Sequence, residues 1–225
     1  MSLFTAIGGF ISLAISTVGP VIATVTDVLI NKLPPAIEVA KVTIAAISVV
    51  ISELCEVLDI APPNEKVDEL GAKVMQEDTR PKMEEESTQE YLDYLRNDVK
   101  LDEEKYMSMS ETEKIACEAL GTSMLAKSIE EKTGIELPPE FLFTISKSKL
   151  RYEQVEKFIH TFSENEIYSM GEFTKYISNN MSETEAVKVG GVVKEAIKEL
   201  SPEMTDADIQ KEIVAMKRDY FSEND

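Results

Sequence analysis

The most constraining feature of the sequence is an N-terminal run without charge. No Asp, Glu, Lys or Arg occurs from residue 2 to residue 26, and bulky apolar side chains recur throughout the run. Apolar surface of this extent is unfavourable in water and does not stay exposed on a soluble monomer. The run must therefore be buried in a lipid bilayer, between subunits or within its own chain. It lacks the basic residues that open a secretory signal, so we do not expect it to be cleaved as one.

A second apolar run follows a proline-containing break. Leu33-Pro34-Pro35 interrupts the first run, a second extends from Ala36 to Ile60, and Pro62-Pro63 ends it. Proline is unfavourable inside a helix but suits the first turn of the next one. Two apolar segments joined in this way are typical of an antiparallel helical hairpin, which we predict for residues 1–61.

Spacing favours helices over strands in both runs, although their many Val, Ile and Thr residues would also suit strands. Small or polar residues recur at alternating intervals of three and four, which places them on one face of a helix. Small side chains allow two helix backbones to approach closely. We therefore predict a helix-packing seam that contains Thr5, Gly9, Ser12, Ser16, Gly19, Ala23, Ala45, Ser48 and Ser52.

Length distinguishes the two runs as membrane segments. Residues 3–26 would form a helix of about 36 Å, which exceeds a hydrocarbon core of about 30 Å. In the second run only Val42–Ser52 is uncharged, which corresponds to about 16 Å. The first helix can span a bilayer. The second would place Lys41 or Glu53 near the hydrocarbon, so its assignment stays open between a membrane segment and a packed partner.

Charge is concentrated outside the apolar runs. Residues 1–61 carry two basic and five acidic groups, a net charge of −3, whereas residues 62–225 have a net charge of −16. Only four arginines occur in the chain. This balance argues against nucleic-acid binding, which needs clustered Lys and Arg, and against attraction to anionic lipid headgroups.

The remainder of the chain has amphipathic helical patterns. Helix-capping sequences occur at Ser87/Glu90, Ser110/Glu113, Ser182/Glu185 and Thr205/Asp208. Residues 76–88 have no apolar period. We therefore predict an all-α protein with a hydrophobic helical hairpin (1–61), a helix and acidic linker (62–88), and an acidic helical domain (89–225).

Few residues suit catalysis or metal binding. The chain has one histidine and two cysteines. This excludes a His cluster for zinc and a disulfide framework. Cys55 and Cys117 are expected as buried free thiols, and His160 at the edge of a core or at a helix end. No catalytic, cofactor-binding or metal-binding residue is predicted, and we do not expect an enzyme.

These features predict a membrane-inserting or membrane-anchored oligomer that acts as a pore, plug or anchor. Its partners through residues 3–60 would be a lipid bilayer or other subunits, and its location the membrane or a large assembly. The alternative is a soluble structural subunit of a large assembly, such as a phage-like particle, with the hairpin buried between subunits. The two differ in whether the chain needs lipid or detergent to stay dispersed.

Overall fold

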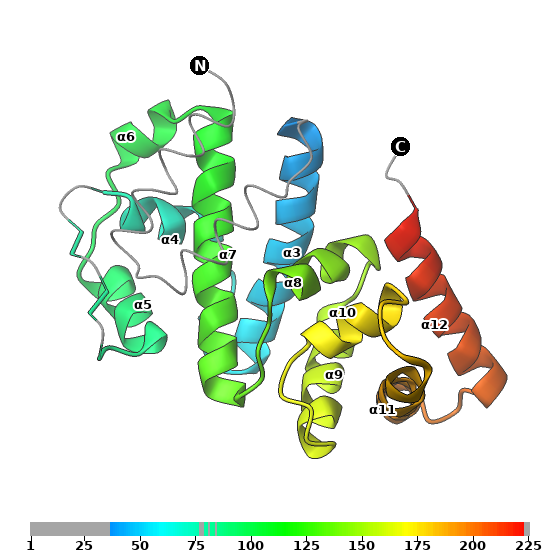
Figure 1. Cartoon of the computed structure of the whole chain (residues 1–225). Coiled ribbons are helices and arrows are strands. Elements are labelled where there is room, and N and C mark those ends of the chain that lie inside the picture. Colours follow the sequence, from blue (N-terminus) through cyan, green and yellow to red (C-terminus); the bar gives the residue numbers. More distant parts are fainter. Residues whose placement is uncertain (1–36, 77–78, 81, 84, 223–225) are drawn as a thin grey trace. The chain divides into compact units, whose positions relative to one another are not determined.

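A computed structural model describes residues 37–222 of the chain, apart from residues 77–78, 81 and 84. Within this part the regular structure consists of helices α3 to α12, without a strand (Figure 1). One isolated parallel bridge pairs Glu136 with Ser169. The predicted all-α class is therefore confirmed for the described residues. The first half of the predicted hairpin lies outside them.

The chain divides into two compact units, with the boundary between Lys132 and Thr133. The described helices of unit 1 are α3 (Ile37–Val57), α4 (Val67–Val74), α5 (Thr88–Asn97), α6 (Glu103–Ser108) and α7 (Glu111–Thr133). Unit 2 contains α8 (Pro139–Lys147), α9 (Tyr152–Glu164), α10 (Gly171–Ile177), α11 (Glu183–Leu200) and α12 (Asp206–Phe221). This boundary falls inside residues 89–225, which the sequence predicts to be one acidic helical domain.

Unit 1 is built around α7, which is buried along most of its length from Ile115 to Ile129. Helix α3 runs parallel to it (Figure 1). Contacts between them recur at every seventh residue, the repeat by which two helices keep one seam in register. They join Lys41 to Glu111, Ser48 to Glu118, and Cys55 Sγ to the Leu125 carbonyl.

The second apolar run contributes the core of unit 1. Ile44, Ile47, Ile51 and Leu54 of α3 are at most 1% exposed. Full burial of one such side chain stabilises a fold by about 1.5–3 kcal/mol. Helix α3 is thus a structural helix of the folded unit.

Helices α4 and α7 cross with their backbones in close contact, because each has a glycine at the crossing. A Cβ atom on Gly71 would lie 1.9 Å from the Cys117 carbonyl oxygen. A Cβ atom on Gly121 would lie 2.1 Å from the Val67 carbonyl oxygen. Only glycine fits at both positions.

The described residues of the predicted acidic linker are held in place by contacts within unit 1. The Arg80 guanidinium donates two hydrogen bonds to the Glu86 carboxylate, at 2.9 and 2.6 Å. It lies 4.1 Å from the centre of the Tyr94 ring, a favourable cation–π distance. The Tyr91 hydroxyl donates to the Arg80 carbonyl at 3.0 Å. Residues without an apolar period are therefore fixed here by local contacts, of which those of Arg80 are the most extensive.

Unit 2 has an aromatic centre at Phe173 of α10. Its ring centroid lies 5.9 Å from that of Phe141, 4.7 Å from that of Phe158 and 6.3 Å from that of Phe162. Helix α11 contacts α9, α10 and α12, and α8 contacts α10 and α12. The aromatic residues of three helices therefore share one core.

Sequence predictions about single residues have mixed outcomes. The capping boxes at Ser87/Glu90 and Ser182/Glu185 are confirmed, as is the burial of Cys55 and Cys117 as free thiols. The prediction for His160 is wrong. Its side chain is 62% exposed on α9, with Nδ1 3.2 Å from the Glu164 carboxylate, because Phe158 and Phe162 take the inner face of that helix.

Candidate functional site

The candidate site of unit 1 is an exposed stripe along α3, which we call the α3 outer stripe. Val42 and Val49 are 64% and 56% exposed, although both are apolar and lie on a helix whose other face is fully buried. Neighbouring positions on the same side are half-buried. The stripe consists of Val42, Ala45, Val49, Ser52 and Glu56.

The helix geometry separates this stripe from the face that contacts α7. Lys41, Ser48 and Cys55 face α7, and each precedes a member of the outer stripe by one residue, a rotation of about 100°. The apolar part of the stripe extends from Val42 to Val49. Glu53 and Glu56 make the following turns polar.

The described residues of the predicted helix-packing seam do not all lie on one face of α3. Ser48 is 5% exposed and donates a hydrogen bond to the Glu118 carboxylate of α7. Ala45 and Ser52 are half-buried and belong to the outer stripe. Thr5, Gly9, Ser12, Ser16, Gly19 and Ala23 lie outside the described residues, and their packing stays a prediction.

Glu118 is the main electrostatic feature beneath α3. Its burial raises the pKa of the carboxyl group above the usual value of 4.5, and nearby Asp68 raises it further. The hydrogen bond from Ser48 acts in the opposite direction. Asp68 in turn accepts a hydrogen bond from the Tyr106 hydroxyl. This cluster links α3, α4, α6 and α7 within unit 1.

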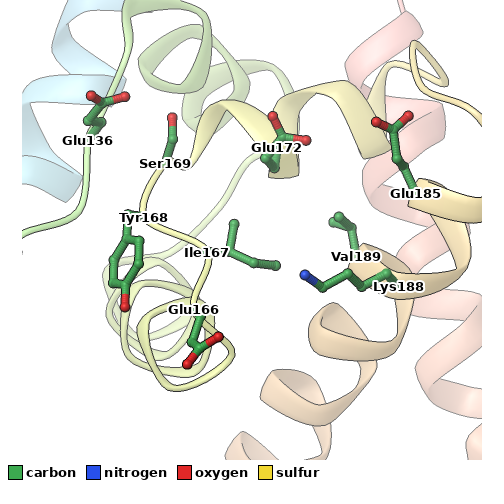
Figure 2. A pocket seen from close by; sticks show the side chains of 9 residues that line it. All are labelled: Glu136, Glu166, Ile167, Tyr168, Ser169, Glu172, Glu185, Lys188 and Val189. Atoms are coloured by element: carbon green, nitrogen blue, oxygen red, sulfur yellow. The ribbon is translucent and has the colours of Figure 1, made fainter.

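Unit 2 has a shallow open groove of about 400 Å³ beside the bridge between Glu136 and Ser169. Figure 2 shows Ile167 and Val189 at its centre and carboxylates around them. Tyr168 is 59% exposed at one side. The remaining lining residues are Glu136, Glu166, Ser169, Glu172, Glu185 and Lys188.

The polar groups of this groove take part in local structure. Glu185 accepts hydrogen bonds from the backbone N–H and hydroxyl of Ser182, at 3.0 and 2.6 Å, which lowers its pKa. Glu172 accepts from Lys175 at 2.7 Å. The Ser169 hydroxyl accepts from the Gly171 N–H at 3.2 Å. The lining contains no pair of nucleophile and base of the kind that covalent catalysis uses.

Other chemistry is equally restricted in the described part of the chain. No three His, Cys, Asp or Glu side chains gather there into a set that would hold a metal ion. Burial raises the pKa of the Cys117 thiol to about 12, so the nucleophilic thiolate is scarce at neutral pH. None of the described helices combines the length and the apolar character needed to cross a membrane.

Comparisons with protein-family models, curated proteins and solved structures found no match. The candidate site therefore depends on the physical character of the surfaces themselves. Val42 and Val49 were not predicted as surface residues, because apolar spacing alone does not tell which face of an apolar helix is covered. The charged residues that adjoin this face, Lys41, Glu53 and Glu56, were the available signal.

Proposed function

We propose that this chain is a membrane-anchored protein in which residues 3–30 enter a lipid bilayer while the acidic helical units remain in water. The observation that supports this most is the different use of the two apolar runs. Helix α3 buries Ile44, Ile47 and Ile51 within unit 1, which favours keeping the second run with the folded protein. The first run has no charge over residues 2–26 and needs an apolar environment of its own.

The composition of residues 3–26 fits this role. Pro20 is compatible with it, because membrane helices tolerate a proline that soluble helices disfavour. A single segment with a large acidic remainder fits an anchor better than a pore. Of the two apolar runs, we therefore assign the membrane role to the first run alone.

Flotation with vesicles of zwitterionic phosphatidylcholine tests the proposal on the full-length chain. We expect the unmodified protein to float. The double substitution Ile15→Glu and Val18→Glu should abolish flotation, since a charged side chain at the centre of a spanning helix costs about 3 kcal/mol. Val187→Glu with Val214→Glu is the matched control, because these valines of unit 2 are 78% and 55% exposed.

The alternative function is a soluble structural subunit of a large assembly. It is favoured by α3, in which an apolar run is already buried inside folded protein. Residues 3–30 would then be buried between subunits. If the unmodified chain does not float and elutes without detergent as one discrete large particle, the membrane proposal is wrong and this alternative stands.

A further inference from the structure

We propose that the α3 outer stripe is the docking surface for residues 19–26 of the same chain, which pack on it as an antiparallel helix. Val42 and Val49 are 64% and 56% exposed and lie two turns apart on one face. They follow closely after the break at Leu33-Pro34-Pro35, so the preceding segment of this chain is the nearest apolar partner.

We take the centre of the proline break as the centre of the helix pair. Residues before proline disfavour the helical conformation, so Leu33 and Pro34 place the turn at position 34. In an antiparallel pair that turns there, facing positions have numbers that add to 68. Thr26 then faces Val42, Ala23 faces Ala45, and Gly19 faces Val49.

This register matches the surface in shape. Residues 19, 23 and 26 are spaced by four and three, and residues 42, 45 and 49 are spaced by three and four, so both sets follow one helical stripe. Each exposed valine meets a small residue, Thr26 or Gly19. Such pairs let helices approach closely and cover the valine side chains.

Charge supports the same register. Asp27 is the one charged side chain among residues 1–31, and the sum of 68 places it opposite Lys41. Lys41 also pairs with Glu111 of α7, and its side chain remains 49% exposed. Gly19 is the residue that begins the docked helix, because a residue before proline disfavours the helical conformation while Pro20 suits the first helical turn. The register is therefore not carried beyond Gly19. Glu53 and Glu56 also make the stripe polar there.

Docking is distinct from the membrane proposal and does not depend on it. Combined with that proposal, it requires that residues 19–26 leave the α3 outer stripe before residues 3–26 can span a bilayer. The stripe would then be covered in water and exposed when the protein is anchored.

Disulfide trapping in the full-length chain tests the docking. Thr26→Cys with Val42→Cys, and separately Gly19→Cys with Val49→Cys, should form disulfides within one chain under mild oxidation. The control is Thr24→Cys with Val42→Cys, because residue 24 lies about 200° from residue 26 and so on the opposite face of the docked helix. We expect the in-register pairs to react about tenfold faster or more, since docking raises the effective concentration of the two thiols.

The outcomes separate the possibilities. Equal rates for the in-register and control pairs would overturn the docking, as would disulfides that form only between chains, which would indicate a second copy on the stripe. Circular dichroism shows whether each variant is folded. If one in-register variant does not fold, the other in-register pair still tests the docking. Flotation without trapping contradicts the docking alone. Trapping without flotation contradicts the membrane anchor alone.

A second measurement detects the release of residues 19–26 from the α3 outer stripe. In the single variant Val49→Cys, a maleimide should label the thiol slowly in buffer and faster once phosphatidylcholine vesicles are added. Val187→Cys on the exposed surface of α11 should label at one rate in both conditions. Labelling of Val49→Cys as fast as Val187→Cys in buffer would show that the stripe is not covered.

Discussion

At the scale of single residues, the structure shows how a buried polar group of unit 1 finds its partner. Ser48 illustrates this. As a small residue on an apolar helix it indicated close helix packing, but the structure uses its hydroxyl to donate to Glu118. Its spacing was visible in the sequence. Its partner was not, because Glu118 is distant in the chain and becomes a neighbour only when α3 and α7 pair.

Glu118 gives a pH prediction. Burial and Asp68 raise the pKa of its carboxyl group above 4.5, so the ionised form is disfavoured in the folded protein. Its contribution therefore lowers stability above the folded-state pKa, and this loss disappears as pH falls toward 4.5. Glu118→Gln keeps an acceptor for Ser48 without the charge. We expect it to raise the urea midpoint at pH 7 and to have little effect at pH 4.

Glu203→Gln is the control for this change, because Glu203 is exposed in the loop between α11 and α12. It should leave the midpoint unchanged at both pH values. A Glu118→Gln variant that is less stable than the unmodified chain at pH 7 would contradict the argument.

At the scale of elements, helix ends were easier to predict than helix partners. Ser182 and Glu185 form a capping box from local sequence alone, and the structure has both hydrogen bonds. The crossing of α4 and α7 was not predictable in this way. Gly71 and Gly121 are far apart in sequence, and a glycine inside a helix can equally mark a bend or an end.

That crossing gives the second prediction. Alanine is normally favoured over glycine inside a helix by about 0.5–1 kcal/mol. At Gly121 the added Cβ would lie 2.1 Å from the Val67 carbonyl oxygen, so α4 would have to move. We expect Gly121→Ala to lower the free energy of unfolding by about 1–3 kcal/mol, as overpacking does. Urea denaturation measures the change.

Gly191→Ala provides the matched control. Gly191 lies within α11, where an added Cβ would meet nothing within 4 Å. The same substitution should there raise the free energy of unfolding by about 0.5–1 kcal/mol. If Gly121→Ala were stabilising to the same extent, the close backbone contact between α4 and α7 would be disproved.

At the scale of the whole molecule, the separation of charged from apolar residues could be predicted from the sequence. The role of α3 could not. Both apolar runs have helical spacing, and only packing shows that the second one lies in the core of unit 1. The charged residues of that run were the sequence signal against lipid burial: Glu38, Lys41, Glu53, Glu56 and Asp59. The difference between the two runs now supports a single anchoring segment.

Net charge gives the last prediction. The chain carries −19 at pH 7, so an anionic bilayer should repel it while residues 3–26 favour insertion. Flotation should be weaker with phosphatidylglycerol vesicles than with phosphatidylcholine vesicles in low salt. The difference should shrink with added salt, because the screening length falls from about 30 Å at 0.01 M to about 3 Å at 1 M. Stronger flotation with phosphatidylglycerol in low salt would mean that a local basic surface, rather than the apolar segment, dominates binding.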